Sequence, residues 1–140
     1  MSPIENKFKR HIDSLSPIFD FIDRFVLREK IDDDTKHAVF LAVDELFTNM
    51  VKYHPQSLGD VVVELSAVNE TLIVRLVDQD VESFDMTRKP DPDLTGTLEE
   101  RKPGGLGIFL TKKFMDDVQY EHRDRTSTII LKKKFRRKNV

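Results

Sequence analysis

The sequence predicts an α/β protein of the α+β type: a two-layer sandwich with helices on one face of a mixed, mostly antiparallel sheet. Two observations lead to this prediction. Strand-like and helical stretches follow one another as strand, helix, helix, strand, strand, long loop, helix, strand, strand. In two places this order has two consecutive strands, and a short turn joins the strands of each pair. Such turns connect antiparallel strands. No internal repeat or second domain is visible, so residues 1–140 are expected to form one domain.

Two helices are expected in the first third of the chain. Ser16 is predicted as an N-cap and Pro17 as the first helical residue, and this helix should run to about Glu29. The second should run from about Asp33 to Tyr53, because the residue before a proline avoids the helical region and His54-Pro55 follows. Its apolar stripe consists of Val39, Val43, Leu46 and Met50, flanked by Ala42 and Phe47.

An acidic run, Asp32-Asp33-Asp34-Thr35, stands at the start of the second helix. Three consecutive aspartates suggest a metal site, but the central glycine and distal glutamate of an EF-hand loop are missing. We interpret the run as a helix cap whose charges complement the helix dipole.

The strands are expected at the N-terminus and in two hairpins. Asn69-Glu70 is predicted to form the tight turn of the first hairpin. The predicted strands are 4–12, 61–65, 72–77, 118–121 and 128–135. Each of these stretches is short and, apart from the polar first one, rich in the residues that favour strands.

A long polar segment separates the two halves of the chain. Asp78 to Pro103 is predicted as a loop of roughly 25 residues, a length typical of functional lids or disordered segments. A helix should follow from Gly105 to about Asp117. Its inward-facing residues should be Leu106, Phe109, Leu110, Phe114 and Met115.

Composition excludes several classes of function. There is no cysteine, so disulfides, thiolate metal sites and cysteine nucleophiles are excluded. No run of about 18 apolar residues and no signal-peptide core occur, so we expect a cytoplasmic protein without membrane association. The net charge of −2 argues against direct nucleic-acid binding.

Basic residues crowd the C-terminus between Lys132 and Lys138. A solvated edge strand that continues into a tail explains them most simply. A docking patch for an acidic partner or an anionic surface is the alternative.

Chemistry-bearing residues occur in four places. Glu45 and Asn49 are four residues apart, so one helix face presents both, although a solvated helix face has the same pattern. Asp78 follows a buried-type strand where the long loop begins. The turn Gly104-Gly105-Leu106-Gly107 allows close backbone approach to phosphate and points amides at it. Thr128 lies on the last strand.

Together these residues resemble the GHKL (Bergerat) ATP-binding fold, and within it the anti-sigma-factor serine/threonine-protein kinases of bacteria. The resemblance covers nearly the full chain. Asp44 to Tyr53 is similar to that family's N-box, and Ser83 to Asp85 to the stretch after its first glycine box. Pro103 to Leu110, with Phe114 to Val118, is similar to its second glycine box and the helix that follows.

The resemblance implies a role for each residue. Asn49 would coordinate Mg²⁺, and Glu45 would orient and deprotonate the attacking serine hydroxyl or a water. Asp78 would accept a hydrogen bond from the adenine amino group, and Thr128 would support Asp78 directly or through a water. The backbone amides of the second glycine box would hold the phosphates of ATP: Gly104, Gly105, Leu106 and Gly107.

One stretch departs from the family pattern. After the adenine-binding aspartate the family has Asp-x-Gly, whereas this chain has Asp78-Gln79-Asp80, and the stretch to Phe84 is one residue longer. Either Asp78 or Asp80 could be the adenine aspartate, and Asp78 is favoured because it directly follows the strand. Carboxylates at Asp80 and Glu82 would repel ATP if they pointed inward.

Three functions remain open at this point. The first is a serine kinase that phosphorylates an anti-sigma-factor antagonist, sequesters a sigma factor and forms a homodimer, as the resemblance implies. The second is a binding module with weak or no phosphotransfer, which the altered first glycine box favours. The third is a GHKL ATPase of another pathway, against which the missing phosphoacceptor and dimerisation helices argue.

Overall fold

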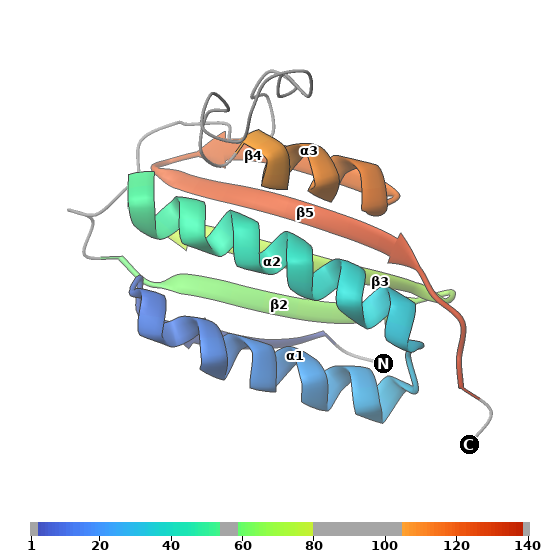
Figure 1. Cartoon of the computed structure of the whole chain (residues 1–140). Helices are drawn as coiled ribbons and strands as arrows, with labels where there is room; N and C mark the ends of the chain where they lie inside the picture. Colours follow the sequence, from blue (N-terminus) through green and yellow to red (C-terminus); the bar gives the residue numbers. More distant parts are fainter. Residues whose placement is uncertain (1–2, 54–58, 80–104, 139–140) are drawn as a thin grey trace.

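The computed structural model describes residues 3–53, 59–79 and 105–138. Their backbone follows the predicted order of elements (Figure 1). The elements are β1 (Ile4–Phe8), the 3-10 helix η1 (Ile12–Ser14), α1 (Leu15–Glu29), α2 (Asp33–Tyr53), β2 (Val61–Val68), β3 (Thr71–Gln79), α3 (Gly105–Phe114), β4 (Asp117–Arg123) and β5 (Thr126–Lys134).

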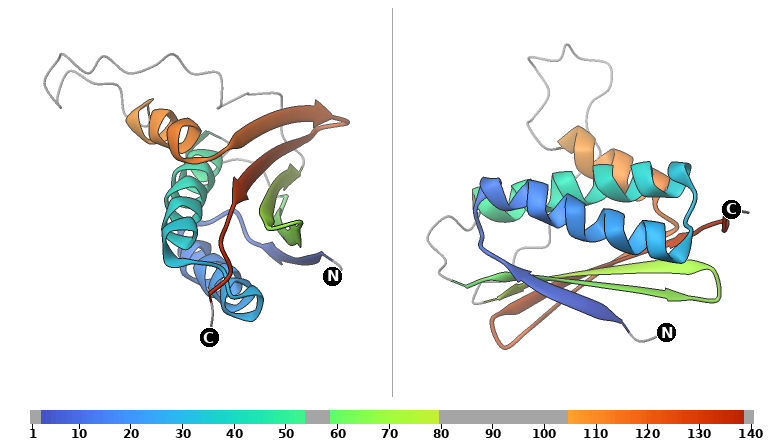
Figure 2. Two further views of the ribbon diagram at one scale, coloured as in Figure 1. Left: turned by 90° about the vertical axis from the view of Figure 1, so that its right-hand side faces the viewer. Right: turned by 90° about the horizontal axis from the view of Figure 1, so that it is seen from below.

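The strands form one sheet in the order β1-β2-β3-β5-β4. All three α-helices lie on one face of this sheet, and the two layers are seen edge-on in Figure 2. The two-layer prediction is therefore confirmed. Within the described residues every strand pairing is antiparallel, so the sheet is not mixed. The reason is that α1 and α2 run in opposite directions between β1 and β2, and tight hairpins make two of the other pairings.

Helix α2 is the central element of the helical layer. The residues of its predicted stripe are fully buried, and so are the flanking Ala42 and Phe47. They pack on the inward side chains of β2, β3 and β5, among them Val63, Leu76 and Ile129. Because this packing fixes both the rotation and the depth of α2, it also determines where the polar residues of the helix point.

The N-cap of α2 is Asp32, as the acidic run predicts. Its Oδ2 accepts a hydrogen bond from the Thr35 amide at 3.1 Å, and its Oδ1 accepts from the Thr35 hydroxyl at 2.8 Å. Asp32 Oδ1 also accepts from the Arg136 amide at 2.9 Å. The cap therefore connects the start of α2 to the segment that follows β5.

Several predicted boundaries are wrong. Strands β2, β3, β4 and β5 begin or end one to three residues from their predicted bounds, because their pairing continues up to the hairpin turns. The first strand ends at Phe8 rather than residue 12, because residues 12–14 turn into η1. Since η1 leads directly into α1, the helix begins at Leu15 and Ser16 is not its cap. Helix α3 ends at Phe114 because Asp117 already pairs with β5, and the Phe114 side chain, predicted to face inward, is 46% exposed.

Both hairpins have two-residue turns with left-handed backbone. Asn69 and Glu70 have φ values of 50° and 60°, and Asp124 and Arg125 have 50° and 62°. Two successive residues with positive φ are typical of the type I′ turn, whose twist matches that of the strands. The turn predicted at Asn69-Glu70 is confirmed. None of the described helices is long and apolar enough to cross a membrane.

Candidate nucleotide site

Glu45 and Asn49 lie on one face of α2, as their spacing predicts. Asn49 is 3% exposed, and its Nδ2 donates a hydrogen bond to Glu45 Oε1 at 3.5 Å. Glu45 is half-buried. Because the amide nitrogen is directed at Glu45, the amide oxygen of Asn49 is directed elsewhere. The pair therefore combines a carboxylate that can accept a proton with an amide oxygen that can bind a hard cation.

The end of the sheet near the C-terminus of α2 contains a cross-strand row of inward-facing residues. Phe8 pairs with Val61, Val61 with Asp78, Asp78 with Ser127, and Ser127 with His122. Asp78 is the charged residue at the centre of this row and is 1% exposed. It follows Leu76 by two positions and so lies on the same, helix-covered face of the sheet. The sequence therefore placed Asp78 correctly at the end of a buried strand.

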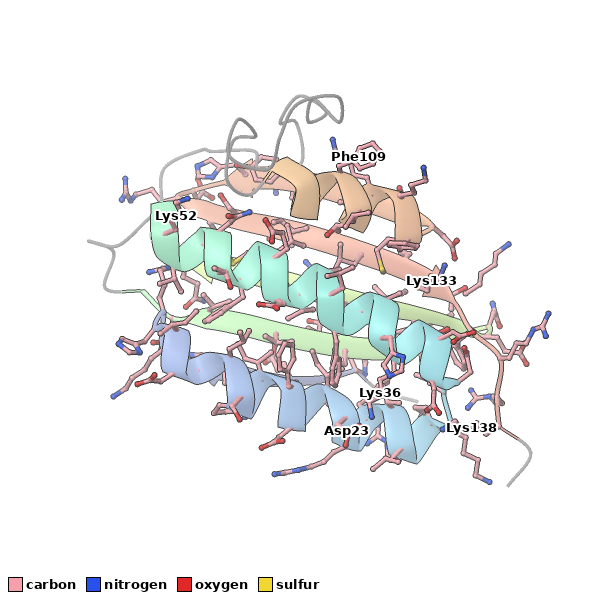
Figure 3. All side chains as sticks on the ribbon, in the orientation of Figure 1. Asp23, Lys36, Lys52, Phe109, Lys133 and Lys138 are labelled. Carbon is pink, nitrogen blue, oxygen red and sulfur yellow. The ribbon has the colours of Figure 1, made fainter. Side chains whose placement is uncertain are left out.

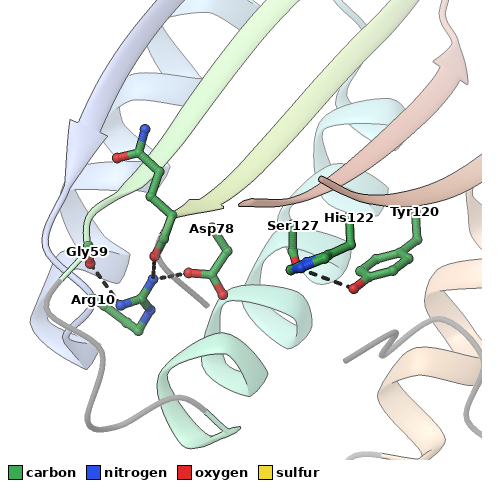
Figure 4. Close-up of polar contacts among 7 residues, drawn as sticks. Arg10, Gly59, Asp78, Tyr120, His122 and Ser127 are labelled. Carbon is green, nitrogen blue, oxygen red and sulfur yellow. Dashed lines mark hydrogen bonds and ion pairs between the residues drawn. The ribbon is translucent and has the colours of Figure 1, made fainter. Parts of the chain in front are cut away.

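Sequence reasoning missed Arg10, which pairs with Asp78. Arg10 lies between β1 and η1, and its side chain is 2% exposed (Figure 4). It forms an ion pair with the Asp78 carboxylate, and it donates to Gly59 O at 2.8 Å and to Gln79 O at 3.0 Å. The pattern around residue 10 has no feature that points to a partner 68 positions away. Such a contact follows only from the pairing of β1 with β2 and of β2 with β3.

The last strand contributes Ser127 rather than Thr128. Ser127 is directly opposite Asp78, whereas Thr128 is opposite Val77 and so belongs to the other face of the sheet. Of the two hydroxyl residues, Ser127 is therefore the one that shares the face of Asp78, and Thr128 is not. A strand slipped by one residue presents the other face, and composition alone does not determine that register.

Ser127 belongs to a small polar cluster. Its Oγ lies 2.9 Å from His122 Nδ1 and 3.3 Å from the Tyr120 hydroxyl. Tyr120 and His122 come from β4, two residues apart, so both face the helical layer with Ser127. Figure 4 shows this cluster on the side of Asp78 that is opposite to Arg10.

The second glycine box opens α3, as expected. Helix α3 begins at Gly105, so the amides of Gly105, Leu106 and Gly107 are in its first turn, where they have no partner within the helix. Helix α3 packs against α2. Gly104, Asp80 and the predicted lid lie outside the described residues.

In the described part of the chain, no three His, Asp or Glu side chains gather into a group that could hold a metal. The Asn49 amide could contribute to a different type of metal site, in which the protein supplies few ligands. Its carbonyl oxygen is a ligand that Mg²⁺ accepts together with phosphate oxygens and water. The chemistry of this residue thus fits a magnesium ion that arrives with a nucleotide.

A separate cavity of about 840 Å³ lies at the other end of the molecule. It is lined by Asp32 and residues of the first half of α2, the turn between β2 and β3, the end of α3, the end of β5 and the segment after β5, including Leu41, Phe114 and Lys133. Figure 3 shows Lys133 far along the molecule from Lys52, which marks the end with the candidate site. Among the described residues, none of those predicted for the site lines this cavity, so it is not the candidate nucleotide site.

Curated relatives of this chain are serine-protein kinases named RsbW. A kinase of this name from Bacillus cereus is 30% identical over 105 residues, which is 71% of this chain and 64% of the relative. That of Listeria monocytogenes is 35% identical over 98 residues, which is 66% of this chain and 62% of the relative. The chain thus spans less than two thirds of the length of these relatives.

A solved structure has the same fold. The crystal structure of the RsbU and RsbW domains of Rv1364c from Mycobacterium tuberculosis matches 99% of this chain with a TM-score of 0.71. It is 11% identical, and the match covers 34% of that chain. The model of the histidine kinase-like ATPase domain matches residues 8–133. These matches confirm the GHKL resemblance seen in the sequence, and the chain belongs to the histidine kinase-like ATPase domain family.

Proposed function

We propose that this chain binds Mg-ATP and transfers its γ-phosphate to a serine of a partner protein. The observation that carries this proposal is the pair on one face of α2, beside α3, in which Glu45 is half-buried and Asn49 is buried. Membership of an ATPase family supports nucleotide binding. The serine-kinase name of the relatives supports the choice of acceptor.

Glu45 is the proposed general base. Its carboxylate accepts the proton of the serine hydroxyl while the serine oxygen bonds to the γ-phosphorus and the bond to the leaving ADP oxygen breaks. Asn49, whose amide nitrogen bonds Glu45, orients that carboxylate and offers its oxygen to Mg²⁺. When bound, Mg²⁺ neutralises charge on the phosphates.

The remaining site residues bind the nucleotide. Asp78 accepts a hydrogen bond from the adenine amino group, with Ser127 beside it in place of the expected support from Thr128. The α3 amides of Gly105, Leu106 and Gly107 hold the phosphates, and Gly104 belongs to the same turn in this proposal. Two strand ends and two helices thus bring together groups that are far apart in the sequence.

The proposed partners follow from the resemblance to the anti-sigma kinases. The serine substrate is an anti-sigma-factor antagonist, and a sigma factor is the protein that the chain sequesters as a homodimer. The relatives' name specifies a serine-protein kinase, which agrees with a protein substrate.

The second candidate is a binding module of the same fold with little phosphotransfer. The observation that favours it is the ion pair between Arg10 and Asp78, because a carboxylate that already has a buried partner gains less from a nucleotide. The two candidates differ in phosphotransfer but not in partner binding, so mutations on α2 separate them.

The deciding experiment compares substitutions on one face of α2. Glu45→Gln keeps the size of the side chain but removes the base, so ATP binding should persist while phosphotransfer falls by about 10²–10⁴. Asn49→Ala should instead lose Mg²⁺-dependent ATP binding. Asp44→Asn, a neighbouring and exposed position, is the matched control and should behave as wild type. ATP binding is measured by calorimetry and phosphotransfer with radiolabelled ATP and the antagonist.

Two results would decide against the kinase. If wild type binds the antagonist but transfers no phosphate to it, the binding module is correct. If Glu45→Gln transfers phosphate as fast as wild type, Glu45 is not the base even though the fold is right.

A further inference from the structure

We infer that Arg10 is a positioning residue for nucleobase recognition: it holds the Asp78 carboxylate in the orientation that distinguishes a base with an amino group from one with a carbonyl. The inference rests on the proposed function, because it concerns the base-binding part of that site. It adds a residue from the N-terminal segment, which lies outside each of the motifs that the sequence analysis identified.

Arg10 connects three segments at the edge of the site. One guanidinium nitrogen donates to the carbonyl of Gly59, two residues before β2, and the other donates to the last carbonyl of β3 and to Asp78 (Figure 4). The guanidinium is planar and presents its donors in a rigid fork, so contacts with three acceptors define its plane and position. Its Nε is buried without a hydrogen-bond partner among the described residues. Contacts on the two terminal nitrogens alone therefore orient the group.

This arrangement fixes the Asp78 carboxylate as well as the strand ends. The terminal torsion of an aspartate is broad, so burial on a strand does not by itself orient the two oxygens. The ion pair with a rigid guanidinium selects one orientation, and the paired carboxylate accepts hydrogen bonds without donating any. A hydrogen-bond acceptor in a fixed place favours adenine, whose amino group is a donor. It disfavours hypoxanthine, which has a carbonyl at the ring position where adenine has the amino group.

The opposite side of Asp78 is also occupied by fixed groups. Ser127 faces Asp78 across the strand pair and is held by His122 and Tyr120. Asp78 thus has the Arg10 guanidinium on one side and this polar cluster on the other (Figure 4). Arg10 forms the ion pair with Asp78, so its removal changes both the orientation and the electrostatic balance of the carboxylate.

The experiment measures the affinity of the purified chain for Mg-ATP and for Mg-ITP, which replaces the adenine amine with a carbonyl. Wild type should bind ITP at least about tenfold more weakly, since one mispaired buried polar group has an effect of this size. Arg10→Met should reduce the preference for ATP to less than about threefold while Mg²⁺ dependence remains. The preference of Arg10→Lys for ATP over ITP should lie between those of wild type and Arg10→Met, because one ammonium cannot contact three acceptors as the guanidinium fork does.

Controls separate positioning from folding. Arg75→Met makes the same chemical change at an arginine of β3, which pairs with Glu64 at 3.6 Å, and should keep the wild-type preference. Arg10→Met leaves a buried carboxylate without its cation, which is destabilising. The double variant Arg10→Met with Asp78→Asn removes that charge, should fold, and should bind ATP and ITP with similar affinity.

The outcomes distinguish this inference from the proposed function. If Arg10→Met and Arg10→Lys weaken ATP and ITP binding by the same factor, Arg10 is only structural and the inference is overturned. If wild type binds both nucleotides equally, Asp78 does not read the base, and again the inference fails although ATP binding stands. If wild type binds neither, the proposed function itself is wrong and the inference with it.

Discussion

At the scale of single residues, the cap of α2 shows how several hydrogen bonds outweigh burial. Burial is the largest single influence on Asp32 and raises its pKa, but hydrogen bonds from the Arg136 amide and from the Thr35 hydroxyl and amide lower it. The net shift is downward from the ordinary value of 3.8. The ionised form of Asp32 is thus favoured by folding, and the fold is stabilised by it.

Asp32→Ala should lower the free energy of unfolding at neutral pH by about 0.5–2 kcal/mol, the usual effect of losing an N-cap. Because the folded-state pKa is below 3.8, the unfolded chain binds the proton first as pH falls. The advantage of wild type should be complete above pH 3.8 and disappear as pH falls through the lower folded-state pKa. Urea titrations at several pH values measure it. The exposed Asp34→Ala is the control, and an equal loss there would contradict a specific cap.

The candidate site was predictable in part at this scale. Glu45, Asn49 and Asp78 could be placed because each has a local signal: a helical spacing, or the end of an apolar strand. Arg10 has none, since its contact with Asp78 depends on how three strands pair. Ser127 and Thr128 could not be distinguished, because a register shift of one residue exchanges the faces of a strand.

At the scale of elements, α2 was predicted with its observed ends and α3 was not. Helix α2 has a long apolar stripe, an acidic cap and a proline after its end, and these signals agree. Helix α3 is short, and its last predicted turn competes with the pairing of Asp117 and Lys132 between β4 and β5. Tertiary pairing overrides local periodicity there, which also leaves Phe114 outside the core.

Leu46 tests whether core packing of α2 supports the site, because it is fully buried and lies between Glu45 and Asn49 in the sequence. Leu46→Ala should lower the free energy of unfolding by about 2–5 kcal/mol, the effect of a cavity in a packed core. Leu41→Ala, on the same helix but 39% exposed, should change it by less than about 1 kcal/mol. Equal losses in chemical denaturation would show that α2 is not packed as described.

At the scale of the whole molecule, the candidate site and the contacts of the C-terminal segment lie at opposite ends. The candidate site gathers at the end where α2 and β3 finish. At the other end the segment after β5 closes the fold: Arg137 Nη1 donates to Glu29 O at 2.6 Å, and the Lys138 ammonium contacts Asp33 at 2.7 Å. The hydrogen bond that the Lys138 ammonium donates to Asp33, together with its charge, lowers the pKa of Asp33. Part of the basic C-terminus thus makes intramolecular contacts, which the sequence alone did not indicate.

Ligand binding at one end should stabilise the molecule as a unit, because the residues of the site come from both layers: α2 and α3 in the helical layer, and β3 and β5 in the sheet. With free Mg-ATP at 100 times the dissociation constant, the free energy of unfolding should rise by about 2.7 kcal/mol. Chemical denaturation with and without Mg-ATP measures this increment. Leu41→Ala, at the cavity of the opposite end, should keep the increment in full. Asn49→Ala should lose it at the same nucleotide concentration, and an increment that survives this substitution would place the nucleotide elsewhere.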